Sequence, residues 1–202
     1  MNEELKKTTF SPEGDEALVR AFQLGDMAAF DKLVLKHKDK LFNIIYWFLG
    51  DYEEANDCAQ ETFIKLFRSL KKFRFESAFS TWLYRIAINT SKNRLKSSEY
   101  RWKKKTVPIE KPEGSKGGNP FLEIKDDSPS PVIEFEKKER LRLIKEAINS
   151  LSEEQNRVIV LRDIQGLSYE EISDITGINL GTIKSRIARG RQELRDKLKG
   201  RI

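Results

Sequence analysis

The chain has 202 residues, of which 38% are hydrophobic and 35% charged, and it carries a net charge of +6. A single cysteine, Cys58, excludes an intramolecular disulfide, and with a single histidine, His37, the chain has few ligands for a zinc site. The longest apolar run, residues 42–49, is too short to span a bilayer, and residues 1–9 lack the apolar core of a signal peptide. The composition favours a helix-rich protein of a reducing cytoplasm with a polyanionic partner, and no metal or cofactor is expected.

Proline and glycine divide the chain in two. Five of the six prolines lie between Pro108 and Pro131, and three glycines lie among them. No apolar periodicity survives there, so residues 98–131 are expected to form a flexible linker. The linker separates an N-terminal domain, residues 13–97, from a C-terminal domain, residues 132–202. The expected fold class is all-α, with two small helical domains.

The N-terminal domain is expected to hold four helices. Asp15 can begin a short helix that ends at Gly25, and Asp26 is a typical N-cap for a long helix that ends at Gly50. Apolar residues recur at helical spacing along the second helix. A third helix is expected over about residues 51–71 and a fourth over about 77–97, with a short aromatic loop between them.

The expected third helix has an acidic outer face. Asp57 and Glu61 lie too far inside the helix for its macrodipole to explain them, and they fall outside the apolar stripe with Ile64 and, at its edge, Gln60. An acidic face with one exposed isoleucine indicates a docking surface for a basic partner. An ordinary solvated face explains the same residues equally well.

The expected fourth helix carries an unusual strip of aromatic, amide and cationic side chains: Trp82, Arg85, Asn89, Lys92 and Asn93. Such side chains stack on bases, bond base edges and contact phosphates, which suits single-stranded nucleic acid. A core position is the simpler explanation for Trp82 alone. Because Tyr84, Ile88 and Leu95 form a further apolar face, this helix is expected to be buried on two sides.

The C-terminal domain is expected to begin with a charged helix over about residues 133–149. Ser152 with Gln155, and Ser168 with Glu171, form two capping boxes, which predict that a helix begins after each serine. Gly177 then predicts a tight turn before a last helix that begins near residue 180. A short helix, a turn containing glycine and a second helix are typical of the helix-turn-helix motif.

The last helix has one apolar face and one face suited to a DNA groove. The second face carries small, polar and basic residues: Gly181, Thr182, Lys184, Ser185, Ala188, Arg189 and Gln192. Small residues allow close approach to the major groove, and the polar ones can bond base edges or phosphates. The alternative is a solvated face on a core helix.

Four segments resemble the extracytoplasmic-function (ECF, group IV) sigma factors of bacterial RNA polymerase. Residues 57–67 (DCAQETFIKLF) and 79–94 (FSTWLYRIAINTSKNR) are similar to region two of that family, and residues 166–172 (GLSYEEI) and 181–191 (GTIKSRIARGR) to region four. The resemblance covers both expected domains in the right order. It implies promoter-specific transcription initiation through recognition of the −35 and −10 elements and opening of the DNA.

The resemblance also implies roles for residues at matching positions. The acidic face, Asp57, Gln60, Glu61 and Ile64, would dock on the clamp helices of the polymerase beta-prime subunit. The aromatic loop and fourth helix would capture and melt the −10 element through Phe73, Phe75, Phe79, Trp82, Arg85, Asn89, Lys92 and Asn93. The −35 element would be contacted by Arg162, Thr182, Lys184, Ser185 and Arg189.

The partners implied by the family are core RNA polymerase (beta-prime clamp helices and beta flap), promoter DNA and an anti-sigma factor. The family works in the cytoplasm, where an anti-sigma factor can hold it at the inner membrane. On the residues alone, a stand-alone helix-turn-helix regulator and an RNA-binding protein stay open. An enzyme with a small-molecule substrate is not expected, because there is no P-loop, dinucleotide fingerprint or plausible catalytic triad.

Overall fold

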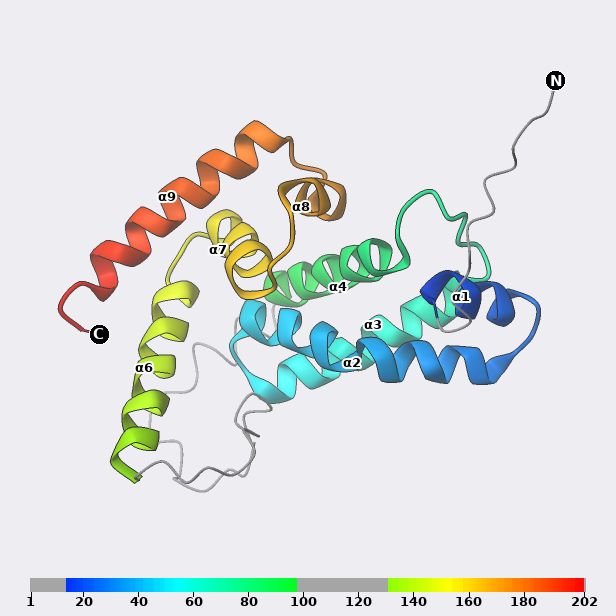
Figure 1. Cartoon of the computed structure of the whole chain (residues 1–202), viewed down its shortest axis with the longest axis horizontal. Coiled ribbons are helices and arrows are strands. Elements are labelled where there is room, and N and C mark those ends of the chain that lie inside the picture. The colour runs from blue at the N-terminus through cyan, green and yellow to red at the C-terminus, as the bar shows by residue number, and fades with distance from the viewer. Residues whose placement is uncertain (1–13, 98–130, 202) are drawn as a thin grey trace.

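The computed structural model describes residues 14–97 and 131–201, and within them every regular element is a helix (Figure 1). This confirms the expected all-α class. Residues 98–130 of the expected linker lie outside the described residues, and so does residue 13 of the expected N-terminal domain. Pro131, the last residue of that linker, is the first residue of a helix.

The N-terminal part contains the four expected helices: α1 (Asp15–Gln23), α2 (Met27–Leu49), α3 (Tyr52–Leu70) and α4 (Phe79–Lys96). Local hydrogen bonds explain where they begin and end. The Asp26 carboxylate accepts from the Ala28 N–H, and Asp51 accepts from the Glu54 N–H, so each satisfies a free donor at a helix start. Gly50 ends α2 with a φ of 78°, a left-handed conformation that glycine adopts without strain.

The C-terminal part contains α6 (Pro131–Asn149), α7 (Glu153–Ile159), the π-helical turn η1 (Val160–Ile164), α8 (Tyr169–Thr176) and α9 (Leu180–Leu198). Both expected capping boxes are present, at Ser152 and Ser168. Gly177 ends α8 in the left-handed conformation, as expected for the turn of a helix-turn-helix motif. The π-helical turn was not expected. In it the Gln165 N–H donates to the Val160 carbonyl, five residues back.

The two parts pack against each other, with α4 lying between the other N-terminal helices and α8 (Figure 1). The apolar face of α4 that was expected to be buried is covered there: Tyr84 and Ile88 are buried, and Leu95 is half-buried. The Arg85 guanidinium donates to the carbonyl oxygen of Asp174 in α8 at 2.5 Å. One apolar core therefore runs through both parts.

Candidate nucleic-acid and polymerase interfaces

The exposed face of α9 is shaped as expected for a groove-reading helix. The Asn179 side chain caps the helix by accepting from the Thr182 N–H at 2.8 Å. Ile183 and Ile187 are buried, whereas Lys184 and Arg189 are exposed. The apolar side therefore fixes α9 on the domain, and the polar and basic side is left open to a partner.

Beside this face lies a hollow of about 340 Å³ between α7 and α9. Thr182, Ser185 and Arg189 line its α9 side, and Ser152 and Gln155 of the first capping box line its other side. Sequence reasoning missed the α7 side, because only the folded chain brings the capping box next to the last helix. The hollow thus places three of the five expected −35 residues together.

The other two, Arg162 and Lys184, meet at Tyr169. The Arg162 guanidinium lies 4.7 Å from the centre of the Tyr169 ring and donates to the Leu167 carbonyl at 2.7 Å. The Lys184 ammonium lies 5.8 Å from the same ring. Tyr169 was missed by sequence reasoning, although it lies in the segment 166–172 that resembles region four and directly follows the Ser168 cap. Both cations therefore lie within cation–π distance of the same ring.

The aromatic loop between α3 and α4 folds over a cluster of rings. Phe73 is buried, with its ring centre 5.0 Å from Phe75 and 4.8 Å from Trp82. Phe79, the first residue of α4, is also buried, and its ring lies 5.3 Å from the His37 ring. Phe75 is half-buried and has a φ of 59°, the only left-handed residue other than glycine in the described chain.

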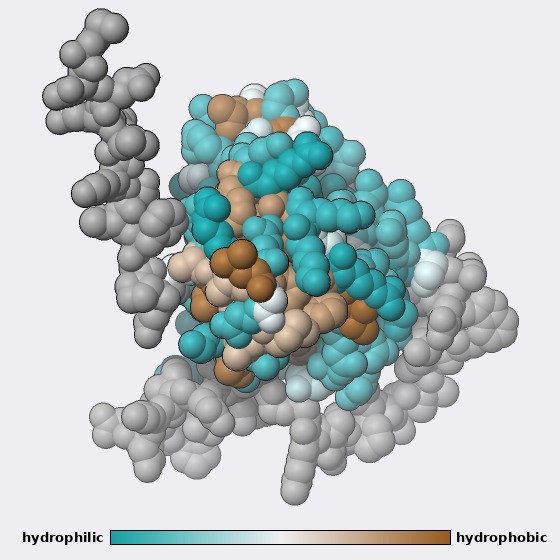
Figure 2. Space-filling view, turned by 90° about the vertical axis from the view of Figure 1, so that its right-hand side faces the viewer, coloured by the Kyte–Doolittle hydropathy of each residue, from teal (hydrophilic) through white to brown (hydrophobic). Residues whose placement is uncertain are grey.

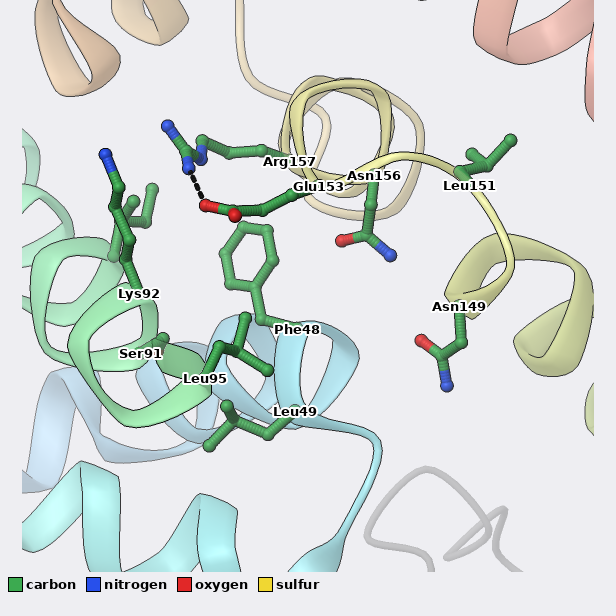
Figure 3. Close-up of a pocket in the computed structure, with 11 residues that line it drawn as sticks. Phe48, Leu49, Ser91, Lys92, Leu95, Asn149, Leu151, Glu153, Asn156 and Arg157 are labelled. Atoms are coloured by element: carbon green, nitrogen blue, oxygen red, sulfur yellow. Dashed lines mark hydrogen bonds and ion pairs between the residues drawn. The ribbon is translucent and has the colours of Figure 1, made fainter. Parts of the chain in front are cut away.

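The structure divides the polar strip of α4. Trp82 belongs to the ring cluster, and Arg85 bonds to α8. Asn89 and Asn93 are exposed. Lys92 is half-buried in a pocket of about 280 Å³ between the two parts (Figure 3). The eight expected −10 residues therefore do not form one open surface in this arrangement.

Figure 3 shows the walls of this pocket: α4 and the end of α2 on one side, and α7 on the other. Phe48 points between them, and Arg157 pairs with Glu153 at 2.7 Å above it. Leu95, from α4, closes the lower side. Lys92 thus lies half-buried at a pocket that α4 shares with the C-terminal part.

The expected docking residues form one exposed face on α3. Asp57, Gln60, Glu61 and Ile64 are all exposed, and the Ile64 side chain is 51% exposed. Phe67, one turn further along, was not among the expected docking residues; it is 40% exposed, and its ring packs against those of Phe22 and Phe30. An aliphatic and an aromatic residue beside two carboxylates suit a partner with basic and apolar side chains.

Two carboxylates of this helix are held by Arg94 of α4. The Arg94 Nε lies 2.6 Å from the buried Glu54 carboxylate, and its Nη2 lies 3.4 Å from Asp57. Next to this pair, burial raises the pKa of the Cys58 thiol, whose sulfur lies 3.6 Å from the Ser91 hydroxyl. A buried thiol with a raised pKa is a structural residue and a poor nucleophile.

The described residues hold no group of three His, Cys, Asp or Glu side chains that could bind a metal ion. None of the helices in residues 14–97 and 131–201 is both long and apolar enough to cross a membrane.

Comparison with known proteins identifies both halves of the chain. Residues 33–100 match the family model of sigma-70 region 2, and residues 141–194 match that of sigma-70 region 4. The chain is 41% identical to the RNA polymerase sigma-H factor of Pseudomonas aeruginosa, over 90% of this chain and 92% of that protein. It is 36% identical to the ECF RNA polymerase sigma-E factor of Haemophilus influenzae, over 91% of this chain and 95% of that protein.

A solved structure has the same fold. The sigma factor RpoE of Bartonella quintana, in complex with the anti-sigma factor NepR, matches with a TM-score of 0.61 and 26% identity. The match covers 85% of this chain and 97% of that one. With two family regions in order and relatives that match along most of their length, the chain belongs to the extracytoplasmic-function group of RNA polymerase sigma factors, the subunits that direct promoter-specific transcription initiation.

Proposed function

We propose that this sigma factor connects polymerase and promoter through three surfaces. The α3 face (Asp57, Gln60, Glu61, Ile64) docks on the beta-prime clamp helices. The aromatic loop and α4 open the −10 element, and α9 reads the −35 element. Residues 13–97 and 132–202 act as separate domains, joined by the linker at 98–131, and the C-terminal domain also contacts the beta flap.

The observation that carries this proposal is the exposed face of α9. Its apolar side is fixed in the core, so the helix can enter a major groove as a rigid body. Arg189 and Lys184 project from the exposed side, and Ser185 and Thr182 line the adjoining hollow. Arginine reaches a guanine edge with two hydrogen bonds, which supplies base specificity, and Arg162 contacts the backbone nearby.

Opening of the −10 element falls to the N-terminal domain. Asn89 and Asn93 can bond the edges of unpaired bases, and Arg85 and Lys92 can contact phosphates. The loop at Phe75 receives a base that has left the stack, because an unstacked base exposes its whole edge to a pocket. The buried rings of Phe73 and Phe79 and the half-buried ring of Trp82 support the loop from below.

This division of labour makes core polymerase necessary for tight promoter binding. Two small DNA contacts on a flexible chain gain affinity only when a partner fixes their spacing. The polymerase supplies both the spacing and the catalytic chemistry, so this chain acts as a recognition subunit and not as an enzyme. It works in the cytoplasm, and an anti-sigma factor inhibits it, as the complex of the Bartonella relative suggests.

Run-off transcription tests the proposal. Purified core polymerase is incubated with a genomic promoter library, with and without the protein. New start sites that depend on the protein and share two spaced upstream elements are expected. Specific duplex binding by the protein alone, without initiation, would instead favour a stand-alone regulator.

A further inference from the structure

Helix α1 contacts the aromatic loop directly, although 47 and 50 residues separate the partners in sequence. The Gln23 Nε2 donates to the Leu70 carbonyl at 3.2 Å and to the Phe73 carbonyl at 2.9 Å. Because both partners can only accept, the amide must present its NH₂ group to them. Three residues earlier, the Arg20 guanidinium lies 4.3 Å from the centre of the Phe75 ring.

The loop needs such contacts because its own backbone supplies few. Within the described chain, residues 74–77 make no backbone–backbone hydrogen bond. Phe75 also adopts a left-handed φ of 59°, which is unfavourable for a bulky residue and persists only where surrounding contacts enforce it. The Phe75 ring contacts the Arg20 guanidinium, and the Phe73 ring packs edge-on against it with the two ring centres 5.0 Å apart.

Helix α1 is itself firmly attached to the domain. Its buried side chains are Leu18, Val19 and Phe22. At its start, Asp15 lies 2.9 Å from His37 Nε2 and 2.8 Å from Lys36 Nζ on α2. Because α1 is fixed at its start and along its length, its last residues form a rigid support for the aromatic loop. Figure 1 shows the end of α1 and the loop side by side.

The end-on view in Figure 2 shows what this arrangement presents. Apolar residues gather at the end of the molecule where α1 and the loop lie, with hydrophilic residues around them. A half-buried ring in a fixed loop at such a surface is suited to stacking on an unpaired base.

We infer that α1 is a positioning element for base capture, with Gln23 and Arg20 as the positioning residues that hold the loop in its receptive shape. The inference rests on the proposed function of the loop at the −10 element. Neither residue needs to touch DNA. Gln23 fixes the backbone at Phe73, and Arg20 fixes the ring of Phe75, so that no ordering of the loop is required when the base arrives.

The test is promoter opening by the full chain with core polymerase, on a promoter found by run-off transcription and carrying 2-aminopurine in its −10 element. Gln23→Glu keeps the shape of the side chain but loses the donors, and Gln23→Ala removes both. Arg20→Ala removes the guanidinium from the ring. Glu16→Ala is the matched control, because it breaks the 2.8 Å ion pair with Arg20 and leaves Arg20 beside Phe75.

Both Gln23 variants and Arg20→Ala are expected to open the promoter about three- to tenfold more slowly, the loss of one or two ordinary hydrogen bonds or a cation–π contact. In the same variants, the ratio of opening rates between the cognate base and a substituted base at the captured position should also fall. Affinity for core polymerase and opening by Glu16→Ala should stay unchanged. If a Gln23 variant unfolds, Arg20→Ala carries the test, because the Arg20 side chain is 54% exposed.

Normal opening and normal base discrimination in these variants would overturn the inference while the proposed function stands. A loss of opening that merely parallels a loss of core affinity would overturn it too, since that indicates general damage. If the unaltered protein failed to support any opening, the proposed function itself would fall, and this inference with it.

Discussion

At the scale of single residues, Arg189 provides the sharpest test of the −35 assignment. It lies exposed on α9 beside the hollow that Thr182 and Ser185 line. If its guanidinium makes a bidentate contact with a base, Arg189→Ala should weaken recognition by about 1–3 kcal/mol. The measurement is transcription from a promoter with an intact −35 element and from one with that element scrambled.

The control is Arg195→Ala, which removes an exposed arginine near the end of the same helix. Arg195→Ala should lower transcription from both promoters equally or leave both unchanged. Arg189→Ala should affect only the intact promoter. Equal transcription by Arg189→Ala and the unaltered protein on the intact promoter would remove Arg189 from the base-reading set.

Glu61 tests the docking face in the same way. It is exposed on α3 and pairs with Lys65 at 2.7 Å. Glu61→Lys reverses its charge against a basic partner, so affinity for core polymerase should fall at least about tenfold, with the loss reduced at high salt. Asp39→Lys makes the same charge change at an exposed position on α2, outside the four docking residues, and should bind core normally. Equal affinities of the two variants for core would contradict the assignment.

Asp15 predicts how the attachment of α1 depends on pH. Burial raises the pKa of this carboxyl, but hydrogen bonds from His37 and Lys36 outweigh it and leave the pKa below the ordinary value of 3.8. A carboxyl whose pKa is lower in the folded than in the unfolded protein stabilises the fold fully at any pH above its unfolded-state pKa. This stabilisation is lost as the pH falls through the folded-state pKa. At pH 5 the unaltered protein should therefore have a larger free energy of unfolding than Asp15→Asn. This difference in stability should close as the pH falls below about 3.8. Urea titrations at pH 5, 4 and 3 measure it, and a gap that stays constant would refute the assigned ion pairs.

At the scale of elements, local chemistry explains what could be predicted from sequence. Asp26, Ser152 and Ser168 begin helices, and Gly50 and Gly177 end them, because caps depend on neighbouring residues alone. Periodicity likewise predicted which sides of α3 and α9 are exposed.

Other features depend on contacts between distant segments and leave no local pattern. The π-helical turn at residues 160–164 changes the apolar spacing too little to be recognised. The contacts of Gln23 with the aromatic loop and of Tyr169 with two cations exist only after the chain has folded. Phe67 is a large apolar residue of a type usually found in the core, yet it is 40% exposed.

The crossing of α7 and α9 at Gly190 is another such feature. A Cβ atom added to Gly190 would lie 2.9 Å from Cγ1 of Ile159, whose side chain is buried. Gly190→Ala should gain up to about 1 kcal/mol of helix propensity but lose about 1–3 kcal/mol to overpacking, and so destabilise the protein. Gly181→Ala is the matched control, because it lies exposed in the same helix and its added Cβ would approach nothing nearer than 3.6 Å.

Urea denaturation of the full chain measures both changes. Gly190→Ala combined with Ile159→Val should recover part of the lost stability, since the smaller side chain makes room at the crossing. If Gly190→Ala were as stable as Gly181→Ala, the two helices would not be in the tight contact that the structure has.

At the scale of the whole molecule, the packing of the two parts conflicts with simultaneous promoter contact. A compact chain of 202 residues has a radius of gyration of about 17 Å. The −10 and −35 elements are separated by about 25 base pairs, or roughly 85 Å of duplex at 3.4 Å per base pair. One compact body therefore cannot reach both elements, and the parts must separate for the proposed function.

The contacts that must break are those that cover α4. Helix α4 packs on α8, where Arg85 bonds to the Asp174 carbonyl, and Tyr84 and Ile88 of α4 are buried. On the side of α6, the Lys145 ammonium lies 3.6 Å from the centre of the Tyr46 ring. The closed arrangement therefore occupies Arg85 and half-buries Lys92, two of the residues proposed to contact DNA. Polymerase binding must supply the free energy that exposes this face.

Energy transfer between two dyes measures this separation. Asp31→Cys on α2 and Lys199→Cys after α9 are exposed labelling positions, in a Cys58→Ala background that leaves no other thiol. Transfer should be high in the free protein and fall when core polymerase is added, and promoter DNA alone should change it little. Arg85→Ala should lower transfer in the free protein, because it removes one contact that holds the parts together. Unchanged transfer in a transcribing complex would mean that the closed arrangement itself reads the promoter, and the assignment of the two DNA surfaces would then be wrong.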